Sequence, residues 1–266
     1  MSGRARLRWV AAGALLMAHD ATAGPATGFL ERTLAFEGAS HRYQVFVPAK
    51  YTRSRRWPVI LFLHGSGERG NDGRLPTTIG IGPALRQYSE RYPAIVVFPQ
   101  APADDRWPGA PARMAMAMLE KTEREFRVDA DRVYLVGLSM GGNGAWYLAY
   151  RFPERFAAMV AICGWFVPRA AQPTSEPVVP ERDGDPDSAL TARLERLPIW
   201  ILHGDSDPVI PPEDSRRIAA RLQSLDAPVR FTEFEHTGHD AWDPAFADPE
   251  LPAWLLSQRR PRSRSH

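Results

Sequence analysis

One stretch decides the fold of this chain: VYLVGLSMGG at Val133–Gly142. Its first half is a continuous apolar run of the kind that forms a buried strand, and its second half places a glycine two residues before and two residues after Ser139. A serine on so tight a strand-to-helix turn has a strained backbone, and only glycine at the flanking positions leaves room for neighbouring chain and an incoming substrate. The stretch therefore predicts a nucleophile elbow, with the serine exposed between a strand and a helix.

The rest of the chain repeats this alternation of strand and helix. From about Thr33 onward, short apolar or β-branched runs alternate with longer segments of helical period, which predicts an α/β fold with a mostly parallel central sheet and helices on both faces. The predicted strands are Tyr43–Val47, Val59–Leu63, Ile95–Phe98, Arg132–Val136, Ala158–Ile162, Ile199–Leu202 and Val229–Phe234. The clearest predicted helices are Ile81–Arg91, Arg113–Phe126, Gly141–Arg151 and Pro212–Leu225. There is no internal repeat, so we expect residues 24–266 to form a single domain.

Two strand ends downstream of Ser139 carry the residue types that activate a serine. A serine hydroxyl needs a base at neutral pH, and a histidine base needs a carboxylate to hold its tautomer. The first strand end offers Asp205 or Asp207, and the second offers His236 or His239. We predict Asp207, because it follows a full turn and precedes a proline, and His239, because it follows a glycine on its loop. Asp205 is then expected to be a turn residue and His236 a partly buried strand residue.

A glycine-rich loop predicts the site that stabilises a developing oxyanion. The segment Ile60–Gly70 reads ILFLHGSGERG, a strand followed by glycines whose backbone N–H groups are free to point at a neighbouring site. Acyl transfer needs such donors. We assign this oxyanion hole to the N–H groups of Ser66 and Met140, the latter being the residue after the predicted nucleophile. His64 precedes the turn, so we expect it to brace the loop by hydrogen bonds.

Large aromatic residues lie near the predicted strand ends. Trp107 follows the strand that ends at Phe98, and Trp242 lies close to His239. Aromatic walls suit an aryl or hydrophobic acyl ester, so both tryptophans are candidate substrate contacts. The alternative is that they pack at the rim of the sheet without touching a ligand.

Metal and cysteine chemistry are not expected. The histidines His64, His203 and His239 have no zinc-binding spacing, so we predict neither a metal nor another cofactor. The only cysteine, Cys163, excludes an intrachain disulfide and is predicted to be a small buried hydrophobic residue.

The first 23 residues have the pattern of a signal peptide. Three arginines precede the apolar run Trp9–Ala18, and the small residues Ala21–Ala23 form a cleavage site before Gly24. Ten residues cannot cross a hydrocarbon core of about 30 Å, so we predict no membrane span. The predicted location is secreted or periplasmic, and the alternative is a short N-terminal helix.

Charge and composition limit the partners. A net charge of +2 over 266 residues predicts no nucleic-acid partner, because phosphate binding needs basic surface concentrated on one face. A basic tail occupies residues 261–266.

The segment Val167–Ser188 has five prolines and no clear period, which predicts an irregular excursion that is either a substrate-shaping cap or a surface loop. We expect the partner to be a small-molecule ester, and the sequence leaves the oligomeric state open.

These motifs together resemble the α/β-hydrolase superfamily. They read HGSGERGND at His64–Asp72, GLSMGG at Gly137–Gly142, HGDSDPV at His203–Val209 and GHDAW at Gly238–Trp242. The resemblance covers about residues 33–260, and the segment Asp248–Arg260 is similar to the family's final helix. Within the superfamily the chain looks most like secreted bacterial esterases, a group labelled "predicted peptidase" or phospholipase/carboxylesterase-like and similar to feruloyl esterases and polyhydroxyalkanoate depolymerases.

The resemblance implies a serine esterase. It carries a Ser139, Asp207 and His239 triad over to this chain and implies hydrolysis of carboxylic esters of modest size through an acyl-enzyme intermediate. The excursion Val167–Ser188 is longer than usual for the family, which leaves substrate size open. A serine peptidase acting on short peptides shares the triad and is the alternative. A catalytically silent binding protein on the same fold is less favoured, because all three triad residues are present.

Overall fold

The computed structural model describes residues 26–260 and contains one eight-stranded sheet in the order β1-β2-β4-β3-β5-β6-β7-β8. β1 and β2 pair antiparallel, β2 also pairs antiparallel with β4, and every other pair is parallel. The predicted mostly parallel sheet is therefore confirmed. The strands are β1 (Gly28–Phe36), β2 (Ala39–Val47), β3 (Trp57–Leu63), β4 (Ile95–Phe98), β5 (Val128–Leu138), β6 (Ala158–Ile162), β7 (Ile199–Gly204) and β8 (Val229–Phe234).

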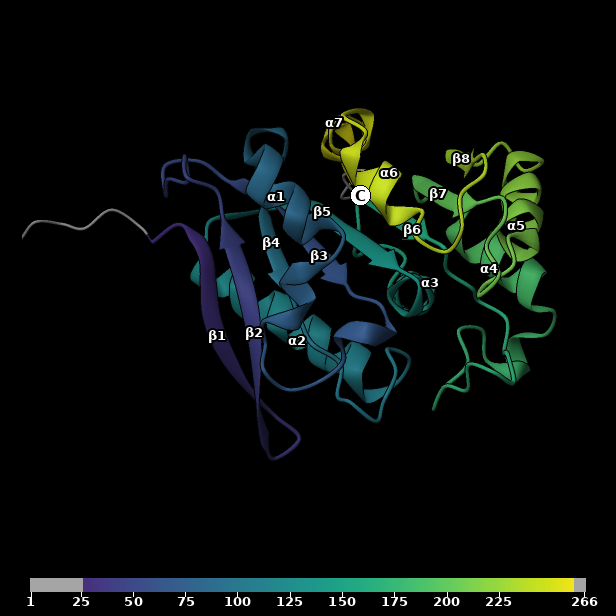
Figure 1. Cartoon of the computed structure of the whole chain (residues 1–266), viewed down its shortest axis with the longest axis horizontal. Helices are drawn as coiled ribbons and strands as arrows, with labels where there is room; N and C mark the ends of the chain where they lie inside the picture. The colour runs from purple at the N-terminus through teal and green to yellow at the C-terminus, as the bar shows by residue number, and fades with distance from the viewer. Residues whose placement is uncertain (1–25, 261–266) are drawn as a thin grey trace, which may run out of the picture.

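Helices cover both faces of this sheet, as predicted. They are α1 (Ile81–Tyr88), α2 (Ala110–Glu125), α3 (Met140–Arg151), α4 (Pro186–Leu194), α5 (Glu213–Gln223), α6 (Trp242–Ala247) and α7 (Glu250–Ser257). Helices α2 to α5 pack on one face, and α1, α6 and α7 pack on the other, where α6 and α7 lie above the sheet and α2 below it in Figure 1. Short 3-10 turns include η1 (Ser66–Glu68) and η4 (Glu181–Asp183).

The pleat of the central strands explains why the core has two halves. In β3, Val59, Leu61 and Leu63 belong to the cluster beneath α2 and α3, whereas Ile60 and Phe62 belong to the cluster beneath α1 and α6. Successive side chains of a strand point to opposite faces, so a strand buried on both faces must be apolar throughout. All seven residues of β3 are buried, which is why its sequence shows a continuous apolar run.

The structure corrects the predicted start of the sheet. It contains β1, which pairs with β2 across the turn Glu37–Gly38 and was not among the predicted strands. β1 lies at the edge of the sheet and has no buried residue. Its sequence GFLERTLAF has only short apolar stretches on either side of a charged pair, a much weaker signal than the apolar runs of the inner strands.

Two predicted segments lie outside the described residues: the signal peptide, residues 1–23, and the basic tail, residues 261–266. The secreted or periplasmic location therefore stays a prediction. Within residues 26–260, no helix is both long and apolar enough to cross a membrane.

Candidate active site

Ser139 occupies the sharp turn between β5 and α3, as the elbow motif predicts. Its φ of 51° lies in the left-handed region that non-glycine residues rarely adopt, and its backbone N–H donates to the Ile162 carbonyl oxygen at 2.8 Å. A Cβ at Gly137 would lie 2.0 Å from the Gly141 oxygen, and a Cβ at Gly141 would lie 1.9 Å from the Leu63 oxygen. Both glycines are required, because the start of α3 fills the side-chain space at Gly137 and the end of β3 fills it at Gly141.

A chain of two hydrogen bonds joins Ser139, His239 and Asp207. Ser139 Oγ lies 2.8 Å from His239 Nε2, and His239 Nδ1 lies 2.6 Å from Asp207 Oδ2. A carboxylate only accepts, so Nδ1 carries the proton and the Nε2 lone pair faces the serine hydroxyl. Ser139 and His239 are 100 residues apart in the sequence, and the fold brings them together with Asp207 in the order that proton removal from a serine requires.

Asp207 is held by donors on both of its oxygens. Oδ1 accepts from the backbone N–H groups of Val209 and Ile210 at 2.8 and 2.9 Å, and the side chain is fully buried. Burial alone raises the pKa of this carboxyl, but hydrogen bonds from His203, His239 and the two backbone groups outweigh it and hold the pKa well below its usual range. Asp207 is therefore an ionised, oriented carboxylate.

The two competing residues lie outside this chain of hydrogen bonds. Asp205 is a turn residue, as predicted: its Oδ1 accepts from Ser206 Oγ at 2.8 Å and from the Thr237 N–H at 3.3 Å. His236 differs from its prediction, because β8 ends at Phe234 and His236 is an exposed residue with a φ of 55°. The chain turns at Glu235 and His236 and brings the loop of His239 back towards Ser139.

Of the two predicted oxyanion donors, Met140 follows Ser139 directly, and Ser66 belongs to a loop that comes close to Ser139 at Gly65. Met140 is the first residue of α3, where helix N–H groups have no carbonyl partner one turn earlier. Ser66 begins the η1 turn directly after Gly65, and a Cβ at Gly65 would lie 3.7 Å from Ser139 Cβ. The loop after β3 and the start of α3 therefore both approach Ser139, and backbone N–H groups from two such segments can form an oxyanion hole.

His64 braces the loop in the way the sequence predicts. Its Nε2 accepts from the Ala101 N–H at 3.0 Å, and its Nδ1 donates to the Gly65 oxygen at 2.6 Å. Complete burial lowers the pKa of His64 to about 4, so the ring is neutral at physiological pH.

The two tryptophans that were candidate substrate contacts have different positions. Trp107 has no exposed surface, and its indole donates to the His64 carbonyl oxygen at 2.9 Å. The structure corrects this prediction, because Trp107 supports the glycine-rich loop from inside the core. Trp242 is partly exposed, and its ring meets the His239 ring edge-on, with 5.3 Å between centroids and 86° between planes. It remains available as a wall of the site.

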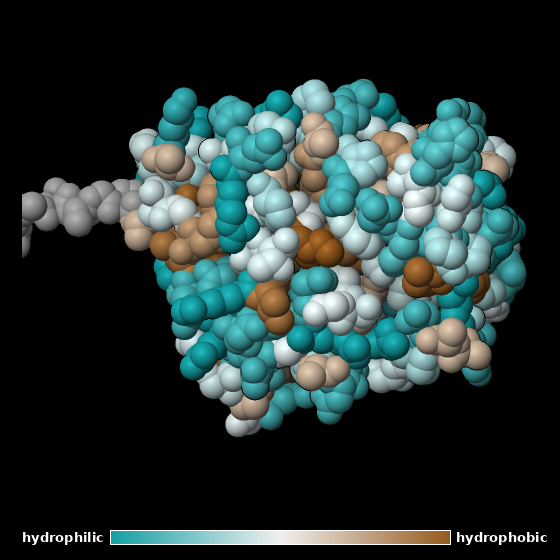
Figure 2. Space-filling view, viewed as in Figure 1, coloured by the Kyte–Doolittle hydropathy of each residue, from teal (hydrophilic) through white to brown (hydrophobic). Residues whose placement is uncertain are grey.

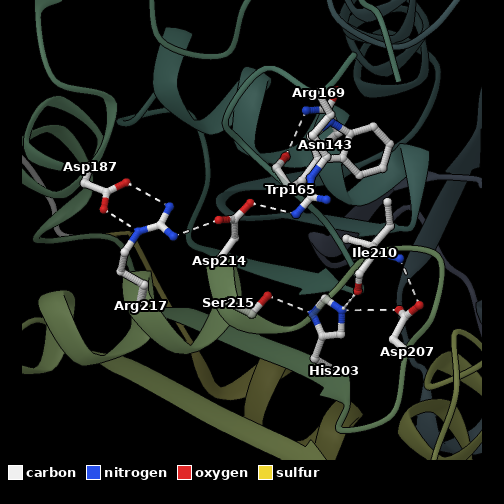
Figure 3. Close-up of polar contacts among 10 residues, drawn as sticks. All are labelled: Asn143, Trp165, Arg169, Asp187, His203, Asp207, Ile210, Asp214, Ser215 and Arg217. Carbon is white, nitrogen blue, oxygen red and sulfur yellow. Dashed lines mark hydrogen bonds and ion pairs between the residues drawn. The ribbon is translucent and has the colours of Figure 1, made fainter. Parts of the chain in front are cut away.

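The excursion Val167–Ser188 is tied to the helices beneath it. Arg169 pairs with Asp214 of α5 at 3.0 Å, and Asp187 pairs with Arg217 of the same helix at 2.6 Å; both pairs are drawn in Figure 3. A cavity of about 370 Å³ lies beneath the excursion, and Asn143, one helical turn after Ser139, lines it. The segment is thus anchored to α5 and shares a cavity with Asn143, and its role as a cap or a surface loop stays a prediction.

One group of potential metal ligands occurs among residues 26–260: Cys163, His203 and Asp207, all buried and with ligand atoms within 4.8 Å of one another. Both nitrogens of His203 already have partners, Ser215 Oγ and the Ile210 oxygen, each at 2.8 Å. Hydrogen bonding accounts for this group, and the expectation of no metal stays a prediction.

The similarity to known proteins agrees with this geometry. A model of the family described as "Putative esterase" matches residues 37–251. The chain belongs to this esterase family. The resemblance to the α/β-hydrolase superfamily is therefore confirmed, and so is the fold class.

Individual relatives of this esterase include both ester and peptide hydrolases. Feruloyl esterase B of Neurospora crassa is 30% identical over 135 residues, which are 46% of this chain and 44% of that protein. Dipeptidyl-peptidase 5 of Aspergillus fumigatus is 26% identical over 219 residues, 73% of this chain and 30% of that protein. The chain thus spans less than half the length of both relatives. The crystal structure of a thermostable esterase has a TM-score of 0.74 and 32% identity, covering 87% of this chain and 63% of that one.

Proposed function

We propose that this chain hydrolyses carboxylic esters with Ser139 as the nucleophile, His239 as the general base and acid, and Asp207 as the carboxylate that orients His239. The observation that carries the proposal is the unbroken hydrogen-bond chain between these residues at the strained turn after β5. Membership of the esterase family supports the ester as the bond that is cleaved.

The geometry supports a two-step mechanism. Ser139 Oγ attacks the ester carbonyl carbon while its proton moves to His239 Nε2, and the carbonyl oxygen becomes an oxyanion that the N–H groups of Ser66 and Met140 stabilise. When the tetrahedral intermediate collapses, the C–O bond to the alcohol breaks and His239 gives its proton to the leaving oxygen. Water, deprotonated by His239, then attacks the acyl-serine and releases the acid.

A serine peptidase is the second candidate, and the similarity to a dipeptidyl-peptidase favours it. A direct comparison of substrates tests the two. We expect p-nitrophenyl acetate, p-nitrophenyl butyrate and methyl ferulate to be cleaved, and aminoacyl p-nitroanilides to be cleaved at least 100-fold more slowly in kcat/KM. Faster cleavage of the anilides would contradict the proposal and favour the peptidase.

A small cavity is linked to the proposed base through Trp242, whose ring contacts His239. It measures about 230 Å³ between α1 and α6. Most of its walls are apolar, among them Ile79, Ala84, Tyr88, Trp242 and Phe246, and Thr78, Gln87 and Asp243 add polar groups. On the face shown in Figure 2, apolar residues form small separate areas in a largely hydrophilic surface, one of them near the middle of the view. Because His239 must protonate the leaving oxygen, the alcohol part of the ester lies on the imidazole side of Ser139. We assign this cavity, with Trp242 as one wall, to an apolar alcohol group.

Filling this cavity is expected to change selectivity. Ile79 is partly exposed at the cavity wall, so Ile79→Trp removes room for a bulky alcohol without touching the proposed triad. We expect kcat/KM for phenyl acetate to fall roughly tenfold or more, and that for methyl acetate to change less than about threefold. Steady-state kinetics on the two acetates measure this directly.

A matched control carries the same change on a distant surface. Leu225, just after α5, is an exposed large apolar residue, and Leu225→Trp should leave both acetates unaffected. Equal losses on phenyl and methyl acetate in Ile79→Trp would contradict the assignment of the cavity while leaving the proposed ester hydrolysis intact.

A further inference from the structure

A second imidazole contacts the carboxylate of Asp207. His203, near the end of β7 and four residues before Asp207, is completely buried and has its Nε2 3.3 Å from Asp207 Oδ2. That oxygen is the same one that accepts from His239 Nδ1. Figure 3 shows the His203 ring between Ser215 on one side and Asp207 and Ile210 on the other. The proposed mechanism makes no use of this ring.

The partners of His203 determine where its proton lies. Nε2 is 2.8 Å from the Ile210 carbonyl oxygen, which only accepts, so Nε2 carries a hydrogen. Nδ1 is 2.8 Å from Ser215 Oγ, a hydroxyl that can either donate to this nitrogen or accept from it. The Nε2–H is thus shared between the Ile210 oxygen and Asp207 Oδ2. His203 is a donor through Nε2, and it cannot turn away without leaving these groups unpaired.

We propose that His203 is a positioning residue for ester hydrolysis, which donates to Asp207 so that the carboxylate stays ionised and aligned while His239 takes up and releases its proton. The inference rests on the proposed function. It gives a role to a buried histidine whose spacing in the sequence does not fit a zinc site.

The donor count at Asp207 explains why a second imidazole matters. With His203 in place, Oδ1 has two backbone donors and Oδ2 has two imidazole donors. Donors to a carboxylate stabilise its charged form and make it a weaker base. Without His203, Asp207 would be a stronger base and would bind the Nδ1 proton of the His239 imidazolium more strongly. The imidazolium would then release its Nε2 proton less readily.

Other titratable groups around the two imidazoles do not take this role. Cys163, at the end of β6, is buried, and burial raises the pKa of its thiol to about 12, so it is neutral. Asp214 precedes Ser215 on α5 but is paired with Arg169 and Arg217, at 3.0 and 2.8 Å. Asp240, next to His239, is exposed to solvent, which screens its charge.

Two substitutions of His203 distinguish the loss of its hydrogen bond to Asp207 from the loss of the imidazole ring. In His203→Gln the side-chain amide reaches about as far as Nε2 and can still donate to Asp207. In His203→Asn the shorter side chain can accept from Ser215 but does not reach the carboxylate. We expect His203→Asn to lower kcat about 10- to 100-fold and to move the acid limb of the kcat/KM profile up by about 0.5–1 pH unit, because His239 holds its proton more tightly beside a carboxylate with one donor fewer.

His203→Gln is the matched control and is expected to recover kcat to within about fivefold of the unsubstituted protein, with the acid limb restored. Thermal unfolding of both variants shows whether each folds. A merely structural role predicts equal losses in the two variants and an unmoved acid limb, and either result would overturn the inference. Failure of the proposed function is distinguishable, because ester hydrolysis would then survive Ser139→Ala as well.

Discussion

Ser139→Ala is expected to lower kcat for ester hydrolysis by about 10⁴-fold or more while the protein stays folded. The substitution removes one oxygen atom, whose hydrogen-bond partner is His239 Nε2. Ser139 lies at the rim of the core with 9% of its surface exposed, and alanine meets the same backbone strain at a φ of 51°. No packing is lost, so the whole effect falls on nucleophilic attack.

Single-turnover and steady-state kinetics with p-nitrophenyl butyrate measure this loss, and thermal unfolding monitors the fold. Ser257→Ala is a suitable control, because Ser257 is an exposed serine whose hydroxyl donates to the Trp254 carbonyl oxygen and accepts from the Gln258 side chain, both at the end of α7. Activity of Ser139→Ala within tenfold of the unsubstituted protein would contradict the assignment of the nucleophile. Pairing Ser139→Ala with His239→Ala should add little further loss, since residues that act as a unit are not additive.

The inner fold could be predicted from the sequence because its constraints are local. The run Val133–Leu138 must be apolar to be buried on both faces, and Gly137 and Gly141 are required because backbone oxygens lie 2.0 and 1.9 Å from where a Cβ would stand. The edge strand β1 could not be predicted in the same way. It is half-exposed, and its stability comes from pairing with β2, which leaves little trace in the pattern of residues.

The burial and the hydrogen-bond partners of side chains around the site were harder to predict than which residues lie there. Trp107 follows a strand end, where substrate contacts are common, but it is completely buried between Gly144 of α3 and His64 of the glycine-rich loop. His203 stands in the motif HGDSD, and its position four residues before Asp207 was visible. Its role depends on Ser215 of α5 and on the path of the loop to Ile210, which only the folded chain brings together.

The two candidate histidines, His236 and His239, are expected to differ greatly in their effect on kcat. His239→Ala is expected to lower kcat by about 10⁴-fold, because it removes the group that takes the Ser139 proton. His236→Ala should change kcat less than about threefold, since His236 is exposed on the turn after β8. Steady-state kinetics across the pH range check both variants, and similar losses in the two would contradict the choice of His239 as the base.

The two candidate aspartates, Asp205 and Asp207, allow a closer comparison, because the same isosteric substitution by asparagine is made at two positions of one loop. Asp207→Asn keeps the shape but presents an amide to His239 Nδ1, which favours the wrong tautomer, so we expect kcat to fall about 10³- to 10⁴-fold. Asp205→Asn keeps an oxygen that can accept from the Thr237 N–H, so the loop that carries His239 stays in place and kcat should change less than about threefold. Steady-state kinetics on the two variants, each checked by thermal unfolding, decide the matter. Comparable losses would mean that the carboxylate supports the loop rather than the imidazole, because only Asp207 lies 2.6 Å from His239 Nδ1.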